Sequence, residues 1–182
     1  MEFRDVLLFV GALCLLAGCS ETQQRRSKWI DVQAHRGARA ERPESTLPAF
    51  RRAIELGADT LELDLAVTRD DQLVVHHDPR VSELLCQSKS VPIRSLSLEA
   101  LKRIDCGARI HPDFPGQQLR PGTPVASFAE VLALVRDTRT SLNIETKVFP
   151  AHPDLTPPPR RFAALVVEAL RGAKMVERST IQ

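Results

Sequence analysis

Hydrophobic and polar residues alternate along several short stretches of the chain, and the stretches between them carry apolar residues at helical spacing. Alternation places successive side chains on opposite faces and is typical of a strand, whereas apolar residues three and four positions apart are typical of a helix. We therefore predict strands at 29–34, 60–67, 73–77 and 141–146, the beginning of a fifth strand at 178–182, and helices at about 46–56, 97–104, 128–135 and 160–170. Ser45 or Thr46 can cap the first helix, and residues 69–72 form a tight polar turn.

Strands that alternate with helices predict an α/β fold with a parallel sheet. A (β/α)8 barrel of the TIM type usually takes about 250 residues. The 182 residues of this chain supply about five strands and end within one, so we expect only the front part of such a barrel. Residues 80–125 are irregular and punctuated by Pro and Gly.

The first 28 residues predict export and a tether. Residues 6–17 are apolar throughout, too short for a membrane-spanning helix but long enough for the apolar core of a secretory signal. Leu16-Ala17-Gly18-Cys19 resembles a bacterial lipobox, which implies cleavage before Cys19 and lipidation of that residue. Residues 1–18 would then be a lipoprotein signal peptide, 19–28 a lipidated polar tether and 29–182 the folded domain; an ordinary signal peptide or an uncleaved anchor is the alternative.

A lipid anchor on Cys19 would attach the protein to the membrane at the periplasmic face of the bacterial envelope. Ser20 after the cysteine resembles the signal for outer-membrane sorting. Nucleic acid is not an expected partner, because the net charge is only +2 and the chain has no Tyr and one Trp to stack on bases.

Two cysteines, Cys86 and Cys106, would remain in the exported domain after Cys14 leaves with the signal and Cys19 is lipidated. An even count in an exported protein favours a disulfide. The alternative, a cysteine metal site, lacks CxxC spacing and a histidine at ligand distance.

Two acids lie on one face of an otherwise apolar strand. Glu62 and Asp64 alternate with Leu61, Leu63 and Leu65, so the carboxylates share one face and the leucines share the other. Neighbouring buried carboxylates repel each other and are costly to desolvate, and a bound cation removes both penalties. The pattern therefore predicts a metal site, although the acids could instead face solvent on an edge strand.

Further chemical groups end the other predicted strands. His35 and Arg36 follow the first strand, His77 closes the third, and Glu145 and Lys147 end the fourth. Three carboxylates suit a hard cation such as Ca²⁺ or Mg²⁺, a guanidinium and an ammonium suit phosphate oxygens, and two imidazoles suit a general base and a general acid. Together these groups predict metal-assisted cleavage of a phosphodiester.

These motifs, in this order, resemble the glycerophosphodiester phosphodiesterase family across about residues 30–182. The segments that carry the resemblance are Ala34-His35-Arg36-Gly37, Arg42-Pro43-Glu44-Ser45-Thr46, Leu61-Glu62-Leu63-Asp64, Val75-His76-His77-Asp78-Pro79 and Asn143-Ile144-Glu145-Thr146-Lys147. Ser45 departs from the asparagine that is usual there. Residues 80–125 look like the lobe that members of this family insert between strands.

The resemblance implies a TIM barrel that hydrolyses glycerophosphodiesters to sn-glycerol 3-phosphate and an alcohol. The 2-hydroxyl of glycerol would attack phosphorus, and water would open the resulting cyclic phosphate. The implied roles are the acid/base pair for His35 and His77, metal ligands for Glu62, Asp64 and Glu145, phosphate binding for Arg36 and Lys147, and metal ligation or support of a ligand for Glu44. His76 points opposite to His77 and receives no role.

Two other functions stay open at the level of the sequence. The chain could be a truncated, non-catalytic surface lipoprotein that at most binds a cation. It could also be a phospholipase D-like relative with similar histidines and metal, which would act on sphingomyelin or lysophospholipid instead.

Overall fold

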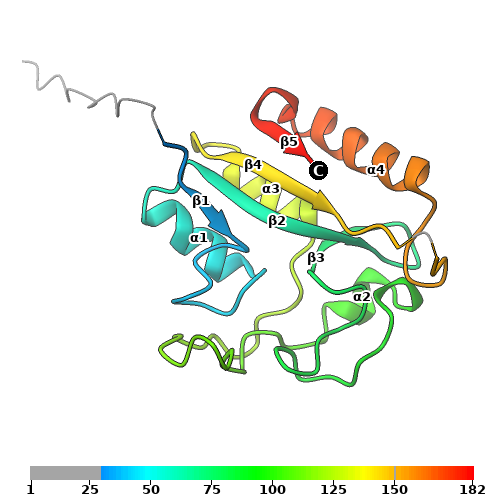
Figure 1. Ribbon diagram of the computed structural model, residues 1–182, viewed down its shortest axis with the longest axis horizontal. Helices are drawn as coiled ribbons and strands as arrows, with labels where there is room; N and C mark the ends of the chain where they lie inside the picture. The colour runs from blue at the N-terminus through cyan, green and yellow to red at the C-terminus, as the bar shows by residue number, and fades with distance from the viewer. Residues whose placement is uncertain (1–29, 150) are drawn as a thin grey trace, which may run out of the picture.

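A five-stranded sheet forms the centre of the computed structural model, which describes residues 30–149 and 151–182 (Figure 1). The elements in chain order are β1 (Gln33–His35), α1 (Leu47–Glu55), β2 (Thr60–Val67), β3 (Leu73–Val75), α2 (Leu98–Leu101), α3 (Phe128–Val135), β4 (Ser141–Thr146), α4 (Pro159–Gly172) and β5 (Ser179–Ile181), with 3-10 turns at Ile93–Ser95 and Val176–Arg178. The predicted signal peptide and the tether with Cys19 lie outside the described residues. Within the described ranges, no helix is long and apolar enough to cross a bilayer.

Four strands run parallel in the order β1-β2-β4-β5, as the alternation of strands and helices predicts. β1 is shorter than the predicted strand at 29–34 and includes His35, because its three residues are the ones that pair with Thr60, Leu61 and Glu62 of β2. The β2–β4 pairing is longer and runs from Thr60 opposite Ser141 to Leu65 opposite Thr146. β2 therefore pairs with three of the other strands, β1, β3 and β4, whereas β5 pairs with β4.

The third predicted strand differs from expectation in direction and length. β3 runs antiparallel to β2, with Leu65 opposite Val75, and it ends at Val75 rather than at residue 77. A parallel neighbour needs a crossover of about a dozen residues, whereas the predicted polar turn leaves room only for a hairpin. In that turn Thr68 N–H donates to the Gln72 carbonyl at 2.9 Å. The sheet thus has the five strands that were expected, but only four of them are parallel.

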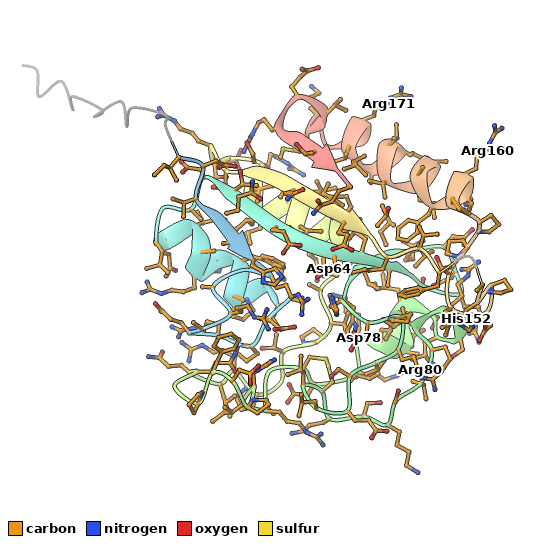
Figure 2. All side chains as sticks on the ribbon, viewed as in Figure 1. Asp64, Asp78, Arg80, His152, Arg160 and Arg171 are labelled. Carbon is orange, nitrogen blue, oxygen red and sulfur yellow. A yellow bond between two sulfur atoms is a disulfide. The ribbon has the colours of Figure 1, made fainter. Side chains whose placement is uncertain are left out.

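The leucines of β2 face the helices. Leu61, Leu63 and Leu65 are fully buried, and they belong to one core cluster with Phe50 of α1 and Phe128 of α3, as well as Phe162 of α4. In Figure 1 α3 lies directly behind β2 and β4, and in Figure 2 the exposed side chains of Arg160 and Arg171 extend from α4 away from the sheet. The helices therefore cover the apolar face of the sheet, and the acids of β2 lie on the opposite face.

Helix ends follow the predicted capping chemistry. Thr46, one of the two predicted caps, accepts a hydrogen bond from Ala49 N–H at 3.3 Å, whereas Ser45 adopts a positive φ of 57°. α3 begins at a capping box in which Ser127 and Glu130 exchange hydrogen bonds, and its bounds are those predicted. Helix periodicity and caps thus located three of the four helices closely, while the helix predicted at 97–104 is limited to α2.

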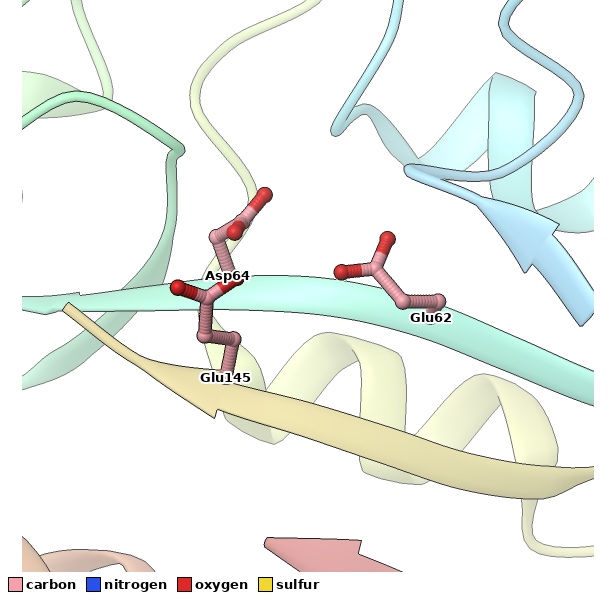
Figure 3. Close-up of side chains that lie close together, drawn as sticks. All are labelled: Glu62, Asp64 and Glu145. Carbon is pink, nitrogen blue, oxygen red and sulfur yellow. The ribbon is translucent and has the colours of Figure 1, made fainter. Parts of the chain in front are cut away.

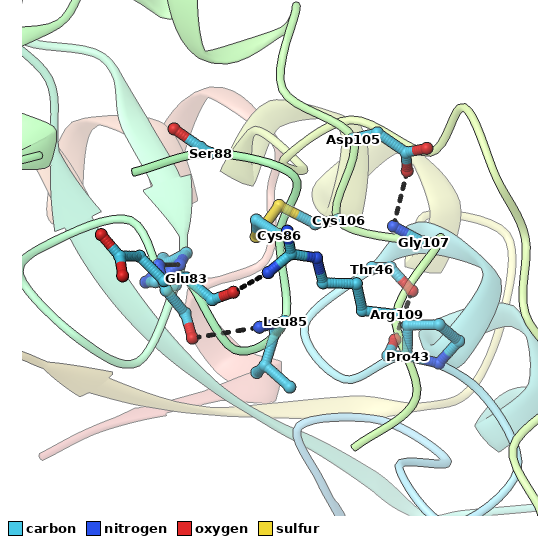
Figure 4. The surroundings of a disulfide bond; sticks show 12 residues. Pro43, Thr46, Glu83, Leu85, Cys86, Ser88, Asp105, Cys106, Gly107 and Arg109 are labelled. Atoms are coloured by element: carbon cyan, nitrogen blue, oxygen red, sulfur yellow. Dashed lines mark hydrogen bonds between the residues drawn. A yellow bond between two sulfur atoms is a disulfide. The ribbon is translucent and has the colours of Figure 1, made fainter. Parts of the chain in front are cut away.

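Residues 80–125 form a lobe whose small core also includes Ala66 of β2 and Val74 of β3. Ile93, Leu101 and Val125 are buried together with Cys86 and Cys106, which form a disulfide (Figure 4). Beside it the Arg109 guanidinium donates to the Glu83 carbonyl, and Asp105 accepts from Gly107 N–H at 2.8 Å. The predicted disulfide is confirmed, and it closes the lobe on itself.

Candidate active site

The acids of β2 and β4 converge on the polar face of the sheet. Asp64 lies opposite Glu145 in the β2–β4 register, and Glu62 lies two residues before Asp64 on the same face. Each of the three side chains offers one carboxylate oxygen, and these three oxygens all lie within 4.8 Å of one another (Figure 3). The structure therefore brings together the three residues that the sequence suggested as metal ligands.

Burial makes this cluster electrostatically unfavourable by itself. Glu62 is 8% exposed and Asp64 only 1%. Burial, with the charges of Asp64 and Glu145, raises the pKa of Glu62, although the Arg36 N–H that donates to Glu62 Oε2 at 2.9 Å acts in the opposite direction. Asp64 Oδ2 accepts no hydrogen bond within the part of the chain that the structure describes. An oxygen-rich, anionic and incompletely satisfied cluster of this kind fits a hard divalent cation.

Two positively charged side chains, Arg36 and Lys147, flank Asp64 (labelled in Figure 2). Arg36 Nε lies 3.2 Å from Oδ2, and Lys147 Nζ lies 3.1 Å from Oδ1. Lys147 also donates to Glu145 Oε1 at 2.5 Å. Burial alone would favour the neutral amine, but the hydrogen bonds to Glu145 and Asp64 prevail and raise the pKa of Lys147. Both residues predicted to bind phosphate therefore carry their charge at the edge of the carboxylate cluster.

A strained turn after β1 places Arg36. Arg36 has a φ of 55°, and Gly37 has a φ of 81° and packs so closely on α1 that a Cβ would lie 2.8 Å from the Ala49 carbonyl carbon. The Arg36 carbonyl accepts from Ser45 N–H at 3.0 Å, which joins this turn to the loop before α1. The Arg36 guanidinium thereby reaches Asp64, and backbone strain at such a point is common in functional sites.

Glu44 holds two arginines rather than joining the carboxylate cluster. Its side chain is 4% exposed, and its two oxygens contact Arg36 Nη1 at 2.8 Å and Arg39 Nη2 at 2.7 Å. Of the two roles that the sequence left open for Glu44, this geometry favours support of neighbouring residues over metal ligation.

The two candidate catalytic histidines lie at the rim of the cluster. His35 ends β1 beside Glu62, with Nε2 3.9 Å from Glu62 Oε2, and its side chain is 56% exposed. Partial burial, and then the charges of Arg36 and Arg39, lower the pKa of His35. His77 lies in the loop after β3, not within a strand as predicted, and its Nδ1 contacts Asp78 Oδ1 at 2.8 Å.

His77 connects two hollows of the surface. One is lined by His77 with Glu145 and Lys147, and the other by His77 with Arg36 and Glu44. A ligand that contacts the carboxylate cluster and the side chains of both Arg36 and Lys147 would therefore also lie within reach of the His77 imidazole.

Three residues near the site were missed or given no role in the sequence. His76 is buried, its Nδ1 contacts the Asp78 carbonyl at 2.9 Å, and burial lowers its pKa, so a neutral ring orders the loop that carries His77. Asp78 orients His77, and only its position next to the histidine hinted at that. Arg39, four positions after His35, contacts that histidine at 3.1 Å, and the sequence analysis gave it no role.

Known proteins match both the sequence and the fold. The chain is 38% identical over 116 residues to a glycerophosphodiester phosphodiesterase of Caldanaerobacter subterraneus subsp. tengcongensis, an alignment that covers 64% of this chain and 44% of that protein. A solved structure from Silicibacter pomeroyi DSS-3, assigned as a glycerophosphoryl diester phosphodiesterase, superposes with a TM-score of 0.77 at 24% identity, over 84% of this chain and 57% of that one.

A phosphodiesterase from Oleispira antarctica, solved in complex with the product sn-glycerol-3-phosphate, superposes with a TM-score of 0.66 at 21% identity, over 84% of this chain and 56% of that chain. The chain thus spans about half the length of the proteins that it matches, and the two structural matches establish the shared fold alone. The model of the "Glycerophosphoryl diester phosphodiesterase family" matches residues 35–177, which include every residue of the candidate site. By that match, the chain belongs to the glycerophosphoryl diester phosphodiesterase family.

Proposed function

We propose that the protein hydrolyses glycerophosphodiesters to sn-glycerol 3-phosphate and an alcohol with the help of a divalent cation. The observation that carries this proposal is the carboxylate cluster of Glu62, Asp64 and Glu145, with oxygens within 4.8 Å of one another and with Arg36 and Lys147 beside it. Membership of the family supports the same reaction.

Each group of the site has a part in this proposal. Glu62, Asp64 and Glu145 hold Ca²⁺ or Mg²⁺, which when bound would polarise a phosphoryl oxygen and stabilise the charge that develops on it. Arg36 and Lys147 bind the remaining phosphate oxygens. Glu44 holds Arg36 in place through its ion pair at 2.8 Å.

His35 and His77 form the acid/base pair. One imidazole accepts the proton of the attacking 2-hydroxyl, and the other delivers a proton to the departing alkoxide, so that the leaving group departs as a neutral alcohol and a cyclic phosphate remains. Water then opens the cyclic phosphate to give sn-glycerol 3-phosphate. Asp78, in contact with His77 Nδ1, orients the second ring. A positioned proton donor or acceptor of this kind contributes about 10²–10⁴-fold to rate.

The test is release of glycerol 3-phosphate from glycerophosphocholine, with and without Ca²⁺ or Mg²⁺, in parallel with lysophospholipid and sphingomyelin. We expect cation-dependent turnover that His77→Asn lowers by at least about a hundredfold while cation binding is kept. His152, exposed in the loop before α4, provides the matched control, and His152→Asn should leave the rate unchanged. Absence of glycerol 3-phosphate with every cation, or a His77→Asn variant of normal rate, would overturn the assignment.

A lipid-anchored location at the periplasmic face is part of the proposal, with Cys19 as the modified residue. The Cys86–Cys106 disulfide supports an oxidising compartment. Labelled palmitate should be incorporated into the protein expressed in bacteria with its leader, and Cys19→Ser should abolish the label. Incorporation that persists in the variant would count against Cys19.

A further inference from the structure

A hollow of about 140 Å³ joins the candidate active site to the inserted lobe. Arg36 and His77 line it on the side of the site. The lobe lines it with residues that are mainly apolar, namely Leu84, Leu85, Val125 and the disulfide of Cys86 and Cys106. Groups that suit a phosphate and groups that suit hydrocarbon therefore share one hollow.

The polar residues that the lobe adds to this hollow already have partners in the protein. Ser82 Oγ accepts a hydrogen bond from Leu85 N–H at 3.3 Å, and His111 Nδ1 accepts one from Asp113 N–H at 3.1 Å. His111 Nε2 also lies 3.5 Å from Arg39 Nη2. The lobe therefore offers mainly hydrocarbon and sulfur to a ligand at this place.

Leu84 is held in the wall of the hollow although it is 54% exposed. The residue before it is fixed because the Glu83 carbonyl accepts from the Arg109 guanidinium. The residue after it, Leu85, packs against the core of the lobe (Figure 4). A single exposed leucine is ordinary on a protein surface. One that is fixed in a hollow leading to a charged site offers an apolar contact to a ligand.

The two hollows that meet at His77 suit the two halves of a phosphodiester. In phosphoryl transfer the attacking and leaving oxygens lie roughly in line through phosphorus, so the two halves extend in different directions. The hollow with Glu145 and Lys147 suits a polar alcohol. The alcohols of biological glycerophosphodiesters are polar, so an apolar substituent has to be carried by the glycerol half. The hollow at the lobe, with Leu84 in its wall, suits that half.

We infer that the hollow at the lobe binds an apolar substituent on C1 of the glycerol, so that the preferred substrates are 1-acyl or 1-alkyl lysophospholipids. The inference rests on the proposed function and narrows its substrate class. The hollow has room for about five groups of the size of a water molecule or a methylene. A longer chain would continue past the exposed Leu84.

Such substrates keep the nucleophile of the proposed reaction. A 1-acyl lysophospholipid retains the free 2-hydroxyl, which attacks phosphorus and displaces the alcohol, and one water then opens the cyclic phosphate. Lysophosphatidylcholine and water thus give 1-acylglycerol 3-phosphate and choline. A diacyl phospholipid has no free 2-hydroxyl and should not react.

Choline release compares the two kinds of substrate in one assay. With the divalent cation present, kcat/KM for 1-hexanoyl-lysophosphatidylcholine should exceed that for glycerophosphocholine by at least about tenfold, the lower end of what an added methylene contributes in an apolar pocket. Leu84→Ser should lower this ratio by about tenfold, and Leu84→Met, which keeps an apolar side chain, should retain it. Leu56, 53% exposed at the end of α1, provides the matched control, since Leu56→Ser should leave the ratio unchanged.

Leucine-methyl NMR tests binding without turnover. The probe is hexylphosphocholine, a phosphodiester that has an apolar chain and no 2-hydroxyl. It should shift the Leu84 methyl signals, which are assigned by their loss in Leu84→Met, and it should leave those of Leu56 in place. Glycerophosphocholine, which lacks the chain, should shift them less.

The outcomes separate this inference from the proposed function. Choline release from glycerophosphocholine without a preference for the hexanoyl compound, or with a preference that Leu84→Ser leaves intact, would overturn the inference alone. Unshifted Leu84 signals with hexylphosphocholine would overturn it whether or not the protein is a phosphodiesterase. Shifted signals without choline release from either compound would remove the proposed reaction and support the hollow as a site for an apolar phosphodiester.

Discussion

Removal of the Lys147 ammonium should have opposite effects on cation binding and on turnover. Lys147 Nζ lies 3.1 Å from Asp64 Oδ1 and 2.5 Å from Glu145 Oε1, so its single positive charge contacts two of the three carboxylates that the cation would use. Since the pKa of Lys147 is raised, the ammonium keeps its charge throughout the neutral range. A divalent cation that binds these oxygens must therefore compete with a fixed positive charge, and Lys147→Met removes the competitor.

The size of the effect follows from Coulomb's law. Two unit charges about 4 Å apart interact by about 4 kcal/mol at an effective dielectric constant of about 20. The Lys147 side chain is 15% exposed, and solvent and side-chain motion reduce the net effect. We therefore expect cation affinity to rise by at least about tenfold, or about 1.4 kcal/mol. Loss of one charged donor to the developing phosphate charge should at the same time lower kcat by about 10²–10³-fold.

Titration calorimetry with Ca²⁺ and Mg²⁺ measures the first effect, and the glycerophosphocholine assay at saturating cation measures the second. Lys102, which forms an ion pair with Glu130 outside the site, provides the matched control, because Lys102→Met also removes a partly buried ammonium. Equal or weaker cation binding by Lys147→Met would refute the competition, and unchanged kcat would refute phosphate binding by Lys147.

Three further predictions concern ligation, the disulfide and acid stability. Asp64→Asn should abolish the cation-induced rise in Tm, measured by scanning calorimetry, and a rise equal to that of the unmodified protein would exclude Asp64 as a ligand. The Cys86–Cys106 disulfide closes a loop with a sequence separation of 20, so Cys86→Ser with Cys106→Ser should lower the free energy of unfolding in urea by about 3 kcal/mol, and no change in the midpoint would contradict this. Hydrogen bonds from Arg161 and Arg94 lower the pKa of Asp71, so this carboxylate stabilises the fold above its unfolded pKa of about 3.9, and the contribution is lost as pH falls through the lower folded value. Between pH 7 and pH 3 the urea midpoint of Asp71→Asn should therefore fall less than that of the unmodified protein, and parallel curves would argue against the linkage.

Local patterns in the sequence were enough to locate β2 and its two faces. The alternation of Leu61, Leu63 and Leu65 with Glu62 and Asp64 predicted both the core contacts and the convergence of acids, because side-chain direction in a strand is a property of neighbouring residues. The bounds of α3 were equally local, since the apolar helical spacing of residues 128–135 predicted them, and the structure adds a capping box at the start of the helix.

Features that depend on distant segments could not be derived in this way. The antiparallel direction of β3 depends on pairing with β2. The turn between the two strands is too short for the crossover that a parallel neighbour needs, so its length already indicated this direction. The contacts of Arg39 with Phe114 and Gln117 join segments that no periodicity relates. Glu44 was recognised as a motif residue, but its ion pairs with two arginines became apparent only in three dimensions.

The side chains of β2 alternate between leucines that pack in the core and carboxylates of the candidate site. This alternation limits which sequence changes the strand can accept. Odd-numbered positions from 61 to 65 supply the packing under the helices, and the even-numbered positions 62 and 64 supply the acids. Insertion or deletion of one residue near its start would exchange the two sets, so that carboxylates would enter the core and leucines would replace the ion-binding oxygens. One such change would therefore destabilise the fold and remove the ion-binding site together. Natural variants of this strand should therefore differ by substitution and never by a change in its length.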